Sequence, residues 1–126
     1  MTQWTVSLLV ALILAVAGAI PQVQAQSAVC PGATANLSAI AFETITVSTT
    51  AIGFTAATMT AAAVMAIATV ETNTVRYRAD GTAPTASVGH SAVAGSIITV
   101  CGPALSRFKM IRASADAPVQ VTYYAR

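Results

Sequence analysis

Apolar and polar residues alternate with a period of two along much of the chain after residue 40. Residues 75–80 (VRYRAD) show this most clearly, with the two arginines on one face and Val, Tyr and Ala on the other. A period of two is that of a β-strand with one buried face. Val, Ile and Thr dominate these stretches and Leu is scarce, which is typical of an all-β protein.

The pattern and the recurring turn residues predict a small single-domain antiparallel β-sandwich with about seven strands. Six strands are expected from alternation: 40–48, 64–71, 75–80, 96–101, 107–113 and 118–125. Segment 51–63 is expected to be a strand followed by an irregular connection, although its alanine content also permits a helix. Strand 40–48 has apolar residues on both faces and is expected to be covered on both sides.

The strand over 64–71 and the strand over 75–80 are separated by Thr72-Asn73 and a further threonine. A tight turn between two strands of opposite direction is typical of a β-hairpin. The sequence therefore predicts that these two strands pair with each other.

Residues 1–25 have the pattern of a secretory signal peptide. Residues 6–20 form an uncharged apolar run, Pro21 breaks it, and Val23-Gln24-Ala25 offers short side chains to a signal peptidase. Cleavage after Ala25 would leave a mature domain of residues 26–126. The alternative is a retained membrane anchor, although the run is shorter than the roughly 20 residues that span a bilayer. The chain is expected to be exported, with no membrane contact after cleavage.

Cys30 and Cys101 are the two cysteines of the chain. In an exported protein such a pair predicts one disulfide, and two free buried thiols are the alternative. A metal site is not expected, because zinc requires four ligands and His90 is the only other soft one. No cofactor is predicted.

The segment 77–90 reads YRADGTAPTASVGH and concentrates turn-forming residues. Asp80 can accept a backbone hydrogen bond, and Gly81 can adopt a positive φ. Pro84 stiffens the segment, and Gly89 ends it. These four residues predict a rigid structural turn that needs no ligand.

A catalytic site is the alternative interpretation of the same segment. His90 could pair with Ser91 or Asp80 in a nucleophilic site. The serines, however, lie in no context that resembles a nucleophile elbow, and the chain has only four carboxylates. The chain is therefore predicted not to be an enzyme.

Four segments carry a resemblance to a known group: ATVETNTVRYRADGTAPTASVGH, AGSIITV, FKMIRA and VTYYA. Together they resemble small, largely uncharacterised proteins encoded in tailed-phage and prophage genomes. The DGTAPTAS turn also looks like the hairpin of chitobiase-type C-terminal β-sandwich modules. Both resemblances imply a β-sandwich without an active site, and the first implies a virion-associated structural or decoration role. The signal peptide and the cysteines depart from that phage pattern and favour an exported homologue.

The formal net charge of +2 is too small to predict nucleic-acid binding. Five cations could still form a contact surface on neighbouring strands: Arg76, Arg78, Arg107, Lys109 and Arg112. Such a surface could contact an anionic polymer or an acidic subunit, or it could be an ordinary solvated sheet face.

Two functions follow from these observations. The first is a non-catalytic subunit of a virion or cell-surface assembly, which self-associates or binds a structural partner through flat, weakly polar sheet faces. The second is a carbohydrate-binding module, for which Tyr124 is the one exposed aromatic platform expected. The predicted location is secreted, in the periplasm, outside the cell or on a virion surface.

Overall fold

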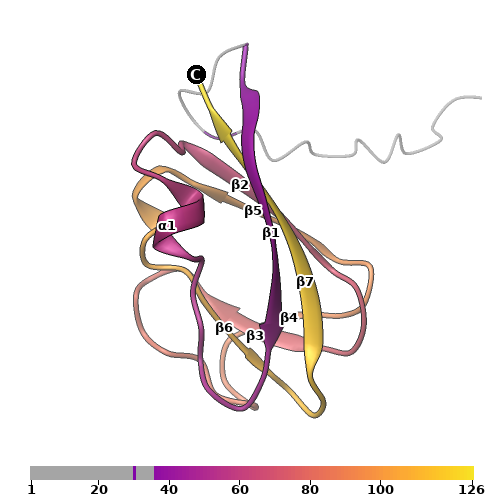
Figure 1. Ribbon diagram of the computed structural model, residues 1–126. Helices are drawn as coiled ribbons and strands as arrows, with labels where there is room; N and C mark the ends of the chain where they lie inside the picture. The colour runs from indigo at the N-terminus through magenta and orange to yellow at the C-terminus, as the bar shows by residue number, and fades with distance from the viewer. Residues whose placement is uncertain (1–29, 31–35) are drawn as a thin grey trace, which may run out of the picture.

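The computed structural model describes Cys30 and residues 36–126 (Figure 1), and the expected signal peptide over 1–25 lies outside the described residues. Within that part, seven strands form two antiparallel sheets, which confirms the predicted all-β fold. The strands are β1 (Ser38–Val47), β2 (Met65–Val70), β3 (Val75–Arg78), β4 (His90–Ala92), β5 (Ile97–Cys101), β6 (Lys109–Arg112) and β7 (Ala117–Ala125). The helices are α1 (Ala56–Met59) and the short 3-10 helix η1 (Gly102–Ala104).

The large sheet has four strands in the order β1-β7-β2-β5, and the small sheet has three in the order β4-β3-β6. β7 is central to the large sheet because it pairs with β1 on one side and β2 on the other. Every second residue of β7, from Ala117 to Ala125, is buried. These side chains face one hydrophobic core shared with Phe108 and Met110 of the small-sheet side.

Aromatic rings fill much of the space between the sheets. The ring of Phe54 stacks on Phe108 with centroids 4.7 Å apart, and it meets Tyr123 edge-on at 5.6 Å. Tyr77 lies 5.6 Å from Phe108 on its other side. Offset and edge-to-face arrangements of this kind are the favoured ones for aromatic pairs. Phe108 and Met110 are 1% and 0% exposed, so both belong to this core.

The predicted hairpin is wrong. β2 pairs with β5 and β7, whereas β3 pairs with β4 and β6, so the turn after β2 carries the chain from one sheet to the other. Both edges of β2 are already occupied, which leaves β3 no place beside it. Asn73 has a positive φ of 60° and donates its side-chain amide to the carbonyl of Asp116 at 2.8 Å. This bond secures the crossing where a hairpin turn was expected.

Segment 51–63 does not form the expected strand. Ile52 makes a single bridge with Met110, and Ala56–Met59 form the helix α1. The helix propensity of alanine therefore outweighs the threonines here. β4 was not predicted, because three residues are too few to show a period.

The expectation that the first strand is covered on both faces is also wrong. Ile45 and Val47 are buried, but Phe42 is 60% exposed and Ile40 is 42% exposed. The small sheet covers only the inner face of the large sheet, and the outer face of β1 has no second layer among the described residues.

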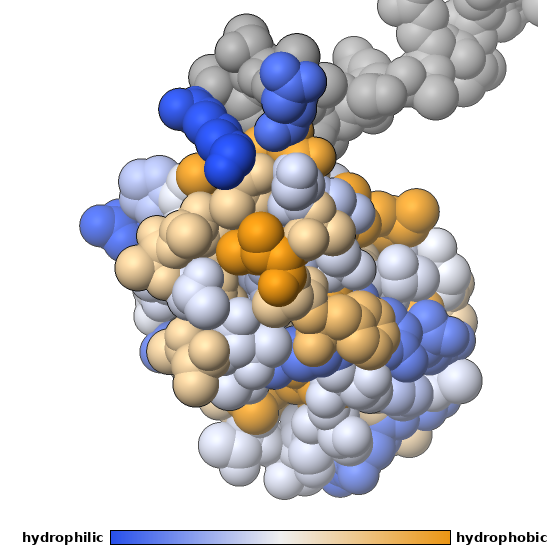
Figure 2. All heavy atoms as spheres, turned by 45° about the horizontal axis from the view of Figure 1, so that its top comes forward, coloured by the Kyte–Doolittle hydropathy of each residue, from blue (hydrophilic) through white to orange (hydrophobic). Residues whose placement is uncertain are grey.

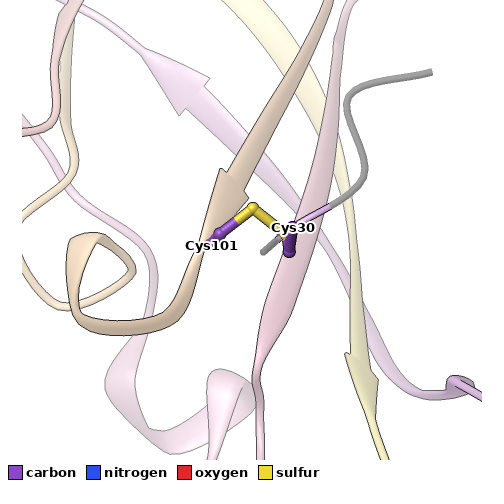
Figure 3. The surroundings of a disulfide bond; sticks show 2 residues. All are labelled: Cys30 and Cys101. Atoms are coloured by element: carbon purple, nitrogen blue, oxygen red, sulfur yellow. A yellow bond between two sulfur atoms is a disulfide. The ribbon is translucent and has the colours of Figure 1, made fainter. Parts of the chain in front are cut away.

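Cys30 and Cys101 are joined by a disulfide, which confirms the predicted pair (Figure 3). Their Cα atoms are 5.5 Å apart, and 71 residues separate them in sequence. Cys101 is the last residue of β5, so the bond attaches Cys30 to the edge strand of the large sheet. Among the described residues, no helix is long and apolar enough to cross a membrane.

Replacing both cysteines by serine should lower the free energy of unfolding. In the chain-entropy model, opening a loop closed over a separation of 71 residues costs about 4 kcal/mol. Urea denaturation of the oxidised wild type and of the double Cys30→Ser, Cys101→Ser variant measures this difference. A reductant should destabilise the wild type and leave the variant unchanged; equal effects on both would contradict the disulfide's role.

Candidate functional site

Three cations lie on the outer face of the small sheet. Arg78 of β3 is directly opposite Lys109 of β6, and Arg76 is opposite Ile111 one rung along. Val75 and Met110, which point the other way, are fully buried, so the alternate residues point away from the core. We call Arg76, Arg78 and Lys109 the basic face. The register confirms that the two cationic strands neighbour each other.

Arg78 is held in place by Asp80 at the beginning of the turn. The carboxylate of Asp80 accepts hydrogen bonds from Nε of Arg78 at 3.1 Å and from Nη2 at 2.5 Å. It also accepts the backbone N–H of Thr82 at 3.1 Å. The hydrogen bond from Arg78 is the main cause that holds the pKa of Asp80 far below its usual range, and the same bond raises the pKa of Arg78. The same carboxylate of Asp80 therefore both shapes the turn and orients Arg78.

The guanidinium of Arg76 makes fewer hydrogen bonds than that of Arg78. Its Nη1 donates to the carbonyl of Gly89 over 3.3 Å, and its Nε is buried with no hydrogen-bond partner. An unpaired buried donor carries a desolvation cost that folding does not recover. Among residues 36–126, neither Arg76 nor Lys109 takes part in an ion pair.

A pocket of about 550 Å³ opens beside the basic face. It is lined by Arg78, Ala79, Asp80, Gly89 and His90. The first three residues come from the end of β3 and the start of the turn, and the last two from the end of the turn and the start of β4. The ends of the predicted turn thus form the walls of the pocket.

Gly89 fixes the shape of that turn. Its φ is +130°, and a Cβ placed there would lie 3.0 Å from the carbonyl oxygen of Tyr77 and 3.2 Å from Cβ of Pro84. Pro84 is itself buried under the turn. Gly81 has a φ of +92° but meets only the side chain of Arg107, at 3.9 Å. Gly89 is therefore the more demanding of the two glycines.

The remaining expected contact residues lie elsewhere. Arg112 is bonded to Asp116 over 2.6 Å, and its register opposite Val75 puts it off the basic face. That hydrogen bond is the main cause that lowers the pKa of Asp116. Arg107 is exposed beside Gly81, and Tyr124 is half-buried on the outer face of the large sheet. The predicted contact surface is thus divided among several places.

The outer face of the large sheet carries no charged side chain over its three central rungs. We call it the uncharged face. Its members are Phe42, Thr44, Met65, Ile67, Thr69, Ile97, Thr99, Gln120, Thr122 and Tyr124. Phe42 and Ile97 are the most exposed, at 60% and 68%. On the side of the molecule drawn in Figure 2, orange hydrophobic residues lie among pale, weakly polar ones, and blue residues occur in several places. The sequence could not reveal this face, because it depends on which strands are neighbours.

Glu43 is the one carboxylate directed toward the core in the described chain. It accepts hydrogen bonds from the hydroxyl of Tyr123 and from the backbone N–H of Thr55, the latter at 3.0 Å. Burial, followed by this bond, raises the pKa of Tyr123 well above its usual range. The carboxylate of Glu43 on β1 thus connects β7 and the start of α1 through hydrogen bonds. The sequence analysis assigned Glu43 no role.

No group of three or more His, Cys, Asp and Glu side chains that could hold a metal ion occurs in the described part of the chain. His90 is exposed, and its ring lies 5.3 Å from that of Tyr77. No hydrogen bond joins its imidazole to Ser91 or Asp80. The expectation that the chain is not an enzyme stays a prediction.

No family model, curated protein or solved structure matches this chain significantly. The resemblance to phage-encoded proteins and to chitobiase-type modules therefore stays a prediction.

Gly89→Ala should be strongly destabilising, because the new Cβ is both strained and too close to the carbonyl of Tyr77. Strain and overpacking together should cost about 3 kcal/mol or more. Gly95→Ala is the matched control, since its φ is +83° but nothing lies within 4 Å of the added Cβ. Its cost should be about 1 kcal/mol. Chemical denaturation compares the two variants, and equal costs would contradict the close approach at Gly89.

The Arg78–Asp80 ion pair should make stability depend on pH. The folded-state pKa of Asp80 is lowered, so its contribution is complete above the unfolded value of about 4 and is lost as pH falls below it. Asp80→Asn keeps an acceptor for Thr82 but removes the charge. The stability gap between wild type and this variant should persist from pH 7 to 5 and shrink by pH 3. Urea titrations at these pH values measure it; a gap unchanged at pH 3 would contradict the ion pair.

Proposed function

We propose that this protein is an exported, non-catalytic structural protein that assembles with copies of itself through the uncharged face. The observation that carries the proposal is the separation of charge on the molecule. The chain has six Lys and Arg and four Asp and Glu, and none of them belongs to the uncharged face. The predicted export signal and the disulfide favour assembly outside the cytoplasm.

A second copy is the partner that best fits this face. A surface without charge offers nothing to attract a charged partner, but it matches itself under a two-fold axis. Phe42 and Ile97 lie at opposite edges of the sheet, on β1 and β5, with threonines between them. The other side chains of the two central strands, Met65, Ile67, Gln120 and Tyr124, are also uncharged, so two such faces can pack on each other and exclude water.

The area of the uncharged face determines how strongly two copies are expected to associate. Four strands about 4.8 Å apart and three rungs along each strand give a patch about 15 Å across. Such a patch buries less surface than a standard stable interface. Association should therefore be weak between two copies and become strong only where many copies repeat the contact.

Phe42→Glu should abolish self-association, because it introduces a charge that the contact would have to desolvate. Sedimentation velocity at protein concentrations up to about 100 µM should show a concentration-dependent oligomer for the wild type. Val88→Glu is the matched control, since Val88 is 52% exposed but lies in the turn between β3 and β4. It should associate like the wild type.

Two outcomes would overturn the proposal. The first is a wild type that stays monomeric over this range. The second is equal loss of association in Phe42→Glu and Val88→Glu, which would place the contact elsewhere. Retention of a monomeric wild type on a neutral polysaccharide, lost in Phe42→Glu or Tyr124→Ala, would instead support a carbohydrate-binding module.

A further inference from the structure

The basic face has a charge arrangement that folding alone does not explain. Arg78 and Lys109 are direct cross-strand partners, and like charges at such positions repel. Arg76 follows on the same face of β3. Asp80 is the only carboxylate bonded to this face among the described residues, and it compensates Arg78 alone. Two cations are left without a counter-charge.

The pocket lies beside these cations rather than apart from them. Arg78 belongs to both the face and the pocket, and Nη1 of Arg76 reaches the carbonyl of Gly89 in the pocket wall. The buried Nε of Arg76 still lacks a partner. A volume of about 550 Å³ is in the range of pockets for small ligands. Arg78 lines the pocket, and Arg76 and Lys109 lie beside it on the basic face, so the pocket and the face together suit one anionic unit.

The other groups of the pocket indicate what that unit carries besides its charge. Asp80 offers carboxylate oxygens as acceptors. His90 also lines the pocket, but its imidazole lies on the other face of the sheet, 5.3 Å from the ring of its cross-strand partner Tyr77. Acceptors beside cations suit a ligand that has hydroxyl groups next to its anionic group. A bare phosphate or sulfate would be repelled by Asp80 and has no use for an additional acceptor.

We propose that the pocket and the basic face bind an acidic sugar unit of a polysaccharide, of the uronic acid class. The sugar carboxylate lies against Lys109 and Arg76, and ring hydroxyls bond the carboxylate of Asp80 in the pocket. The site does not depend on the uncharged face, so it operates in the monomer and in an assembly alike.

A nucleic acid fits this surface less well. Binding of single strands uses exposed aromatic side chains on which bases stack. The one aromatic residue of β3, Tyr77, points to the inner side of the sheet and packs on Phe108. A saccharide with its charge on one group and hydroxyls on the others uses both the cations of the basic face and the carboxylate of Asp80.

The test compares three immobilised polymers with the purified protein: polygalacturonate, neutral galactan and single-stranded DNA. The wild type should bind polygalacturonate, should bind galactan at least about tenfold more weakly, and should lose binding as salt is raised. Lys109→Gln should weaken binding to polygalacturonate about tenfold, the effect of one charged hydrogen bond. Asp80→Asn should weaken it as well, although it makes the surface more positive.

Arg126→Gln is the matched control, since it removes the same charge at the C-terminus, away from β3 and β6 (Figure 1). It should bind like the wild type. Equal loss in Lys109→Gln and Arg126→Gln would overturn the site in favour of non-specific attraction. Stronger binding by Asp80→Asn would overturn the role of its carboxylate. Binding to DNA that equals or exceeds binding to polygalacturonate would overturn the sugar assignment, and so would no binding to polygalacturonate. Phe42→Glu should bind polygalacturonate normally, which separates this test from the one for self-association.

Discussion

The pairing of β7 on both of its edges is the constraint on which the rest of the structure depends. β7 holds β1 on one side and β2 on the other, and its buried alternate residues form the floor of the core. Because both edges of β2 are then filled by β7 and β5, the chain must leave the large sheet after β2. β3 consequently starts the second sheet, and the basic face and the pocket exist because of that crossing.

The sequence predicted the features that depend on one strand at a time. The strand over 118–125, in which alternate residues are buried, and the pairing of Cys30 with Cys101 could be predicted from alternation and from the cysteine count. Partner choice could not, since a period of two says which face is buried but not which strand lies beside it. For that reason the hairpin was wrong and the uncharged face was not foreseen.

Only part of the basic face and the pocket could be predicted, because the sequence pattern does not show which strands are neighbours. Arg76 and Arg78 could be assigned to one face of β3, and the turn residues Asp80 and Gly89 could be recognised from their conformational preferences. That Arg78, Asp80 and Gly89 line one pocket could not be predicted, because it depends on where the turn returns to β4 in three dimensions. The sequence showed the parts of the site without showing that they meet.

The turn connects fold and site through Gly89. A Cβ at this position would lie only 3.0 Å from the carbonyl oxygen of Tyr77, while the carbonyl of Gly89 accepts a hydrogen bond from Nη1 of Arg76. The same residue therefore fixes the path of the chain into β4 and the position of one cation. At the other end of the turn, the carboxylate of Asp80 accepts hydrogen bonds from the turn's backbone and from Arg78, so it also fixes both the chain path and one cation. Since the two ends of the turn bond the side chains of Arg76 and Arg78, these two cations are ordered before any ligand arrives, and the entropy cost of ordering them is met during folding.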